Sequence, residues 1–241
     1  MNDDDLRGLM THGKSLLRAS EPAHAREVFR QAFLLAEQRY GTDAFDSLPS
    51  LLWVIHTFSP LREEAPGEWA EALALCERAL RLAGSDPGAD VRYVIEVLAL
   101  QAVFEHAMGH RDKALAHVRQ AVQAWIQSSA DRRQISDTHL GLCESLLDFG
   151  EPREALDFVE RLRRALEEKP AGRTERRLLR VADFFTGKSL MALGRYNEAR
   201  AVVTARLEAL AKESIDSENP FLLRLQSLLD EIPKQEDEDK G

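Results

Sequence analysis

The chain has 241 residues, of which 44% are hydrophobic, and it carries a formal net charge of −9. This acidic balance disfavours binding to nucleic acids and to anionic membranes, because both attract basic surfaces. No apolar run approaches the ~18 residues that span a bilayer. Residues 1–5 lack the basic and apolar regions of a signal peptide. We therefore expect a soluble, cytoplasmic protein.

Five stretches along the chain share one pattern, in which Gly or Ser precedes an Ala by five residues. The five pairs are Ser20 with Ala25, Gly67 with Ala72, Gly109 with Ala114, Gly150 with Ala155, and Gly194 with Ala199. An apolar residue or Cys follows each Ala four residues later, at Phe29, Cys76, Val118, Val159 and Val203. Successive alanines lie 47, 42, 41 and 44 residues apart, which indicates a repeat with insertions and deletions. The Gly or Ser suits a tight turn, and the Ala suits a close approach of two helices.

This pattern resembles the tetratricopeptide repeat family, whose second helix has an aromatic residue three before the Ala and a large apolar residue four after it. Tyr196, Ala199 and Val203 match best, and Trp69, Ala72 and Cys76 match almost as well. The family's first-helix Gly, twelve residues before the Ala, matches Gly13 and Gly187. Leu16 and Leu190 follow three residues later, Ala102 and Cys143 take the small position in repeats three and four, and the family's closing proline matches Pro170.

The spacing exceeds the usual ~34 residues and is similar to the longer repeats of kinesin light chains and bacterial relatives. The resemblance implies an all-α, right-handed solenoid of five helical hairpins with a C-terminal capping helix. The hairpins are expected at about 4–40, 45–84, 90–128, 132–169 and 173–213, and the capping helix at 218–232. Because each repeat contacts only its neighbours, residues 1–232 are expected to form one superhelical domain. The charged residues 233–241 are expected to be disordered.

Several helix ends can be predicted from capping residues. Ser20 is expected to cap the second helix, with Pro22 in its first turn. Asn219 is expected to be the N-cap of the last helix and Pro220 its first residue. A connector at 60–67, about five residues longer than the other turns by the repeat alignment, is expected to be a tolerated surface loop.

Residues Gly8–Ser15 match the phosphate-loop motif G-x-x-x-x-G-K-S. That motif needs a buried strand before it, so that backbone N–H groups can surround phosphates. Only seven residues precede Gly8, and Gly-Lys-Ser recurs at 187–189 in the same repeat position. We expect a glycine imposed by the repeat rather than a nucleotide site.

Histidines and cysteines offer no convincing reactive or metal centre. His106 and His110 have a spacing that could offer two metal ligands, with His117 on the next helix, but no third ligand of the usual set is evident. Cys76 and Cys143 fall at positions that the repeat buries, so we expect two reduced core residues. No cofactor, metal or catalytic residue is expected.

First-helix side chains that are not used for packing would line a concave groove, as the family resemblance implies. The expected partner-binding residues are Arg7, Lys14, Arg18, Trp53, His56, Glu96, Val103, His106, Asp137, Glu144, Asp148, Phe184 and Lys188. This groove would be basic at its N-terminal end, then aromatic, then acidic towards repeat four, which fits a partner segment of opposite polarity. The alternative is a solvated face on which only the aromatic residues matter.

The sequence therefore predicts a non-enzymatic protein-interaction module, such as an adaptor or scaffold, with another protein as its partner. A dedicated chaperone or inhibitory, immunity-type protein that masks one client is the alternative. A nucleotide-binding enzyme using Gly8–Ser15 is a remote one. Family members that hold a C-terminal carboxylate use Lys and Asn of their first helices, but Asn2, Asn197 and Asn219 lie off those helices. Capture of that kind is not expected.

Overall fold

The computed structural model describes residues 3–58, 66–86, 90–128, 135–168, 172–213 and 219–233, and these residues contain helices and no strand. The chain divides into two compact units, Met1–Arg132 and Arg133–Gly241, and each is described by itself. The connector at 60–65, Pro170 and the tail from residue 234 lie outside the described residues. A single domain over 1–232 stays a prediction.

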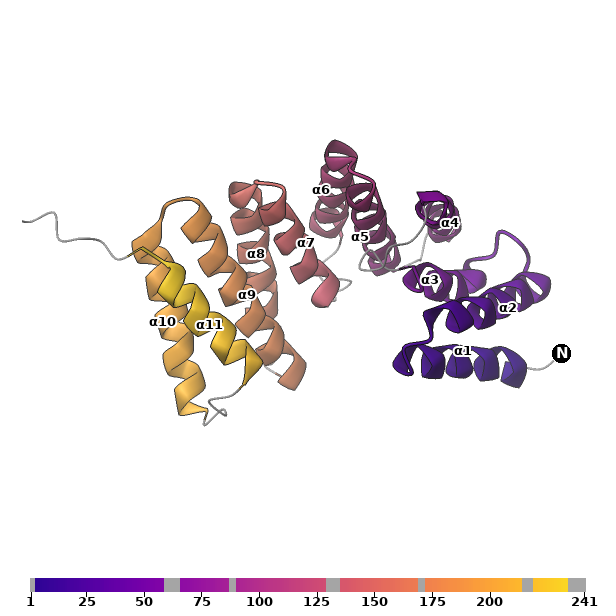
Figure 1. The fold of residues 1–241 in the computed structure, drawn as a ribbon, viewed down its shortest axis with the longest axis horizontal. Coiled ribbons are helices and arrows are strands. Elements are labelled where there is room, and N and C mark those ends of the chain that lie inside the picture. The colour runs from indigo at the N-terminus through magenta and orange to yellow at the C-terminus, as the bar shows by residue number, and fades with distance from the viewer. Residues whose placement is uncertain are drawn as a thin grey trace, which may run out of the picture. The chain divides into compact units, whose positions relative to one another are not determined.

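The first unit contains three helical hairpins (Figure 1). Their helices are α1 (Asp3–Arg18), α2 (Pro22–Tyr40), α3 (Leu48–His56), α4 (Pro66–Ser85), α5 (Val91–Ala107) and α6 (Arg111–Gln127), with a short 3-10 turn, η1 (Phe45–Ser47), before α3. Each helix packs against the next one along the chain from α1 to α6, as expected for a helical repeat.

The second unit contains two hairpins and a final helix. The helices are α7 (Asp137–Asp148), α8 (Pro152–Glu167), α9 (Arg173–Ala192), α10 (Tyr196–Lys212) and α11 (Pro220–Glu231). The last helix, α11, packs on α10 and α9. The Asn219 side chain accepts a hydrogen bond from the Phe221 N–H at 3.0 Å, so the predicted N-cap is confirmed.

The turns within four hairpins repeat one hydrogen-bonded motif. The N–H of the turn residue donates to the carbonyl three residues earlier at 2.9–3.0 Å, and the next N–H donates to the carbonyl five residues before it at 2.8–2.9 Å. The turn residues are Ser20, Gly109, Gly150 and Gly194, with φ between 61° and 80°. This pattern is the Schellman helix ending, which needs a left-handed residue. The small residue of the sequence repeat therefore ends the first helix of a hairpin.

Two details of the predicted turns are wrong. Ser20 does not cap α2: the N-cap is Glu21, because Pro22 is the first residue of α2 and Ser20 is needed earlier to reverse the chain. Gly67 does not lie in a turn but inside the first turn of α4, because Pro66, with a φ suited to a helix start, begins that helix.

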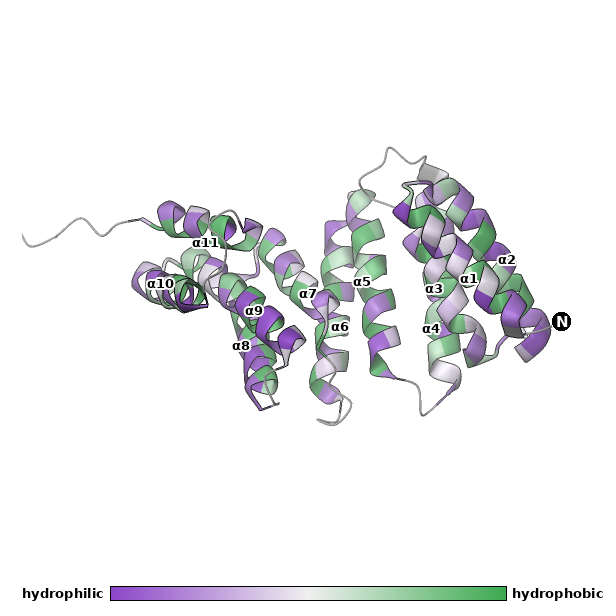
Figure 2. Cartoon of the chain, turned by 90° about the horizontal axis from the view of Figure 1, so that it is seen from below, coloured by the Kyte–Doolittle hydropathy of each residue, from purple (hydrophilic) through white to green (hydrophobic). Residues whose placement is uncertain are grey.

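The alanine repeat marks the buried face of each second helix near its N-terminal end. All five alanines and the five residues four positions later are 0% exposed: Ala25, Ala72, Ala114, Ala155, Ala199, Phe29, Cys76, Val118, Val159 and Val203. Figure 2 shows the resulting apolar stripes along the helices. The sequence pattern therefore predicted the core positions correctly.

Glycines of the first helices allow a bulky neighbour to approach the backbone. A Cβ atom at Gly13 would lie 2.5 Å from Cε1 of Phe29, and one at Gly187 would lie 2.7 Å from Cγ2 of Val203. Such contacts are far inside van der Waals distance, so these helix-interior glycines are explained by packing despite their low helix propensity.

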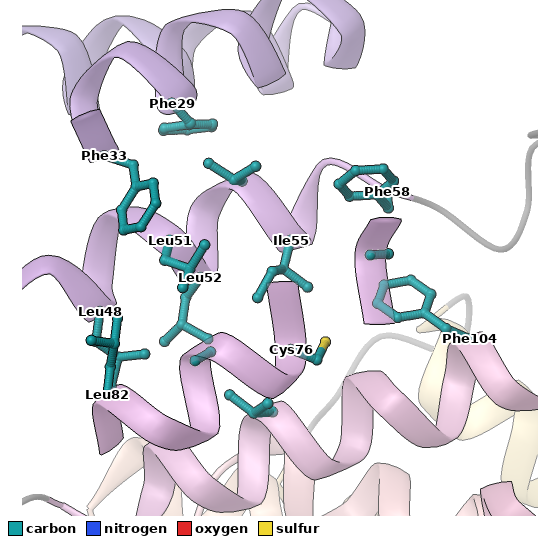
Figure 3. Close-up of a cluster of buried hydrophobic side chains, with 14 of the residues drawn as sticks. Phe29, Phe33, Leu48, Leu51, Leu52, Ile55, Phe58, Cys76, Leu82 and Phe104 are labelled. Atoms are coloured by element: carbon teal, nitrogen blue, oxygen red, sulfur yellow. The ribbon is translucent and has the colours of Figure 1, made fainter. Parts of the chain in front are cut away.

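The core of the first unit is continuous across its hairpins. Figure 3 shows Phe29 from α2, Ile55 from α3, Cys76 from α4 and Phe104 from α5 converging on one cluster. The Phe104 ring packs edge-on against Phe58, with ring centroids 6.4 Å apart. Burial of such side chains from successive helices provides the main stabilising contribution.

Both cysteines are buried and free, which confirms the expected core positions. Burial, with a smaller contribution from Glu77, raises the pKa of the Cys76 thiol to about 12. Burial also raises the pKa of Cys143. The thiols therefore remain protonated at neutral pH, and the thiolate is the reactive form.

The turn geometry predicts opposite effects for a serine–glycine exchange. Ser20→Gly should stabilise the protein by about 0.5–1 kcal/mol because glycine adopts positive φ without steric cost, and Gly109→Ser should destabilise it by a similar amount. Thermal unfolding followed by circular dichroism would measure both. An equal effect of the two variants in the same direction would contradict this account.

The helix contact predicts that Ala199→Leu overpacks the hairpin and costs about 1–3 kcal/mol. Ala201→Leu is the matched control, because Ala201 is exposed on the same helix. Chemical denaturation would compare the two variants. An unchanged midpoint for Ala199→Leu would contradict the buried position assigned to the repeat alanine.

Thiol burial predicts slow labelling in the native state. Both thiols should react with a disulfide reagent only after unfolding, since the folded chain keeps them buried and protonated. The count of labelled thiols before and after adding denaturant would test this. Rapid labelling of the native protein would show that one cysteine is accessible.

Candidate protein-binding surface

The residues that match the phosphate-loop motif do not form a loop. Gly8–Ser15 lies entirely within α1, whose helical hydrogen bonds engage its backbone N–H groups. Gly13 instead accommodates the Phe29 ring, which agrees with a glycine imposed by the repeat. The arrangement that would surround a phosphate is therefore missing from this stretch.

An aromatic contact in the first unit positions several predicted groove residues. Trp53 of α3 stacks on Phe29 of α2, with ring centroids 5.4 Å apart and planes inclined by 25°. Lys14 of α1 places its Nζ 4.8 Å from the centroid of the Trp53 ring, within cation–π range. Trp53 and Lys14 are both half-buried. Trp53 therefore contacts the buried Phe29 on one side and the Lys14 cation on another.

The contacts made by Lys14 and Trp53 continue to α5 through His56. The His56 ring lies 5.8 Å from the Trp53 ring, centroid to centroid. His56 Nε2 lies 2.6 Å from Glu96 Oε1, and both side chains are about one-third exposed. Lys14, Trp53, His56 and Glu96, hereafter the mixed-charge row, therefore make a connected chain of contacts across α1, α3 and α5.

The remaining predicted residues of the first unit are accessible but lie outside this contact chain. Arg7 and Arg18 are exposed at opposite ends of α1. Val103 is 36% exposed, and His106 is exposed in the last turn of α5. They extend the accessible surface of the helices that carry the row.

In the second unit, the predicted acidic residues lie on α7. Glu144 and Asp148 are exposed. Asp137 accepts two hydrogen bonds from Arg177 of α9, at 2.7 and 2.9 Å. These hydrogen bonds lower the pKa of the Asp137 carboxyl, outweighing partial desolvation. Part of the expected acidic character is therefore neutralised by an arginine that the sequence analysis did not consider.

Phe184 lies in the core of the second unit rather than on its surface, at 7% exposed. Its ring packs edge-on against Phe185 and Phe221, with centroids 5.5 and 6.4 Å away. The cations of Lys188 and Arg224 lie 5.8 and 4.9 Å from its centroid. Phe184 therefore lies beside two cations while offering little surface itself.

An arginine-rich cavity in the second unit was not predicted from the sequence. It has a volume of about 750 Å³ and lies between the start of α9, the end of α10 and the start of α11. Its arginines recur at positions 173, 176, 177 and 180, a spacing that places them on one helix face. This spacing is the feature of the sequence from which a cluster of arginines on one face of a helix could have been predicted.

The remaining features to consider are the histidines around the turn after α5, groups that could hold a metal, and helices that could span a membrane. His110 Nδ1 lies 2.6 Å from Glu105 Oε2 across the turn after α5. Within the described ranges, no three His, Cys, Asp or Glu side chains are grouped as a metal site would require. None of the described helices combines the length and apolarity needed to cross a membrane.

Comparison with known proteins agrees with the repeat pattern. The family model described as tetratricopeptide repeat matches residues 137–161, which cover most of the α7–α8 hairpin. No curated protein matches the chain.

Solved structures share the fold at low sequence identity. The nearly identical, kinesin light chain-type TPR-like repeats of Podosopora anserina have 15% identity and a TM-score of 0.65, over 90% of this chain and 100% of theirs. A variant of that protein has 15% identity and a TM-score of 0.64, over 89% of this chain and 99% of its own. Folds of this type are generally scaffolds for protein–protein interaction, and their members are typically non-enzymatic. The repeat alignment, the helical hairpins and these matches show that the chain has a TPR-like helical-repeat fold.

Proposed function

We propose that this protein is an adaptor or scaffold that binds a segment of another protein on the first helices of its hairpins. The observation that carries this proposal is the mixed-charge row of Lys14, Trp53, His56 and Glu96. An accessible row of this kind, with an aromatic centre and opposite charges at its ends, suits an extended or helical segment of complementary polarity.

The chemistry of the row supports a protein ligand more than a small metabolite. Trp53 supplies apolar area, and tryptophan is prominent among the residues that dominate binding energy at interfaces. Its ring is already fixed by Phe29, so little side-chain entropy is lost when a partner covers it. Lys14 and Glu96 are separated along the row and can select the orientation of the partner.

The accessible residues beside the row extend the proposed surface within the first unit. They are Arg7, Arg18, Val103 and His106. In the second unit we propose Glu144, Asp148 and Lys188 as partner contacts, with Asp137 engaged by Arg177 and Phe184 acting beneath Lys188. We also propose that the protein works in the cytoplasm, with which two buried free thiols are compatible.

A charge exchange along the row tests the proposal without altering net charge. Lys14→Glu combined with Glu96→Lys should weaken partner binding about tenfold or more, because both ends of the row then repel the segment that they attracted. Affinity capture from the host, quantified by mass spectrometry, would identify partners that the wild-type protein retains and this variant loses. Titration with the purified partner would then measure the affinity.

The matched control is Lys113→Glu combined with Glu77→Lys, which makes the same exchange at exposed positions of α6 and α4. This control should keep the partner. A partner that is retained equally by both variants would contradict the row as the binding surface. A one-to-one complex with a client that is unstable alone would favour the masking form of the function over the adaptor.

A further inference from the structure

Helix α3 offers only a narrow line of side chains to a ligand. Six of its nine residues are buried, namely Leu48, Ser50, Leu51, Leu52, Val54 and Ile55. The accessible ones are Pro49, Trp53 and His56, and residues three or four positions apart lie on one helix face. A ligand on this surface therefore meets α3 in single file, through Trp53 and His56 of the mixed-charge row.

Each end of the mixed-charge row has the capacity to bind one opposite charge. The Lys14 ammonium has three N–H donors, and it forms no ion pair with a carboxylate of the described residues. At the other end, Oε1 of Glu96 is engaged by His56. No donor from the described part of the chain reaches Oε2 of Glu96, so this oxygen is able to accept from a partner.

Distances along the row set the spacing of the two charges that a ligand needs. Lys14 Nζ lies 4.8 Å from the Trp53 ring centroid, which lies 5.8 Å from the centroid of His56. His56 Nε2 is 2.6 Å from Glu96 Oε1. The two charged ends of the row therefore lie within about 15 Å of each other, a distance that an extended chain covers in about four residues.

Side chains of an extended chain point alternately to its two sides, so residues i, i+2 and i+4 share one side. Charged residues at i and i+4 of such a segment reach both ends of the row. The residue at i+2 then lies against Trp53 and His56 in the middle.

We propose that the row binds an extended segment of a partner in which an acidic and a basic residue lie four positions apart, with an apolar residue midway. This inference rests on the proposed function and specifies its ligand. The acidic side chain pairs with Lys14, the apolar one covers the accessible part of Trp53, and the basic one pairs with Glu96. A uniformly basic segment, which the formal net charge of −9 would attract at long range, is repelled at Lys14.

Three peptides with blocked termini test the charge pattern. They share the frame Gly-X-Ala-Leu-Ala-Z-Gly, where X and Z are Glu and Arg in the mixed peptide, Arg and Arg in the basic peptide, and Glu and Glu in the acidic peptide. Tryptophan fluorescence of the full chain at low ionic strength follows binding. Trp69 and Trp125 are 7% and 1% exposed, so Trp53 is the accessible tryptophan.

The mixed peptide should bind about fivefold or more tightly than either of the other two, because it alone matches both ends of the row. Equal affinity for the three peptides, or no saturable binding of the mixed peptide, would overturn the proposal.

A peptide of the same composition tests the spacing. In Gly-Ala-Glu-Arg-Leu-Ala-Gly the two charges are adjacent and point to opposite sides of an extended chain. It should bind about fivefold or more weakly than the mixed peptide. The same affinity for both would show that spacing plays no part, which would overturn the proposal.

Two single variants should switch the preference. Lys14→Glu makes both ends of the row acidic and should favour the basic peptide over the mixed one by about fivefold or more. Glu96→Lys should favour the acidic peptide in the same way. Lys113→Glu is the matched control, because it makes the same charge change on α6 at a side chain that is 65% exposed, and it should keep the wild-type order. An unchanged order in both row variants, with wild-type circular dichroism spectra, would overturn the proposal.

Failure of this inference differs from failure of the proposed function. If the host partner is lost from the Lys14→Glu, Glu96→Lys double variant while the three peptides bind the wild-type protein alike, the row is a binding surface and the ligand pattern is wrong. If the double variant retains that partner, the proposed function itself fails.

Discussion

The close contact between the helices of a hairpin is the constraint on which the rest of the structure depends. Gly13 lacks a side chain, so the Phe29 ring can lie against the backbone of α1. Phe29 then presents a face on which Trp53 stacks, and Lys14 lies over Trp53. A packing requirement inside the first hairpin thus determines where half-buried side chains of α1 and α3 meet.

The same helical motif carries different chemistry in the two units. In the first unit, a central aromatic residue lies between a cation and a His–Glu pair. In the second unit, arginines outnumber carboxylates among the described residues that line a cavity. The first arrangement places both charges beside an aromatic ring, and the second gathers mainly arginines. A repeat fold therefore leaves ligand chemistry to the positions that packing does not constrain.

A short sequence motif indicates a binding site only where the backbone has the conformation that the site requires. Gly8–Ser15 has the letters of a phosphate loop, but its backbone is a helix and its second glycine makes room for Phe29. The arginines at the start of α9 match no named motif, yet they line a cavity of the second unit. Backbone conformation and the presence of a cavity distinguish these two stretches, and neither can be read from a short sequence motif.

The sequence by itself determined the helices, the turns at Gly109, Gly150 and Gly194, and the buried alanines, because these depend on local conformation and on a repeated spacing. It misjudged Ser20 and Gly67, where a nearby proline sets the helix start. Only the tertiary structure decided that Phe184 is buried, that Arg177 engages Asp137, and that four arginines border a cavity. Those features depend on contacts between helices distant in sequence, which side-chain spacing within one helix does not specify.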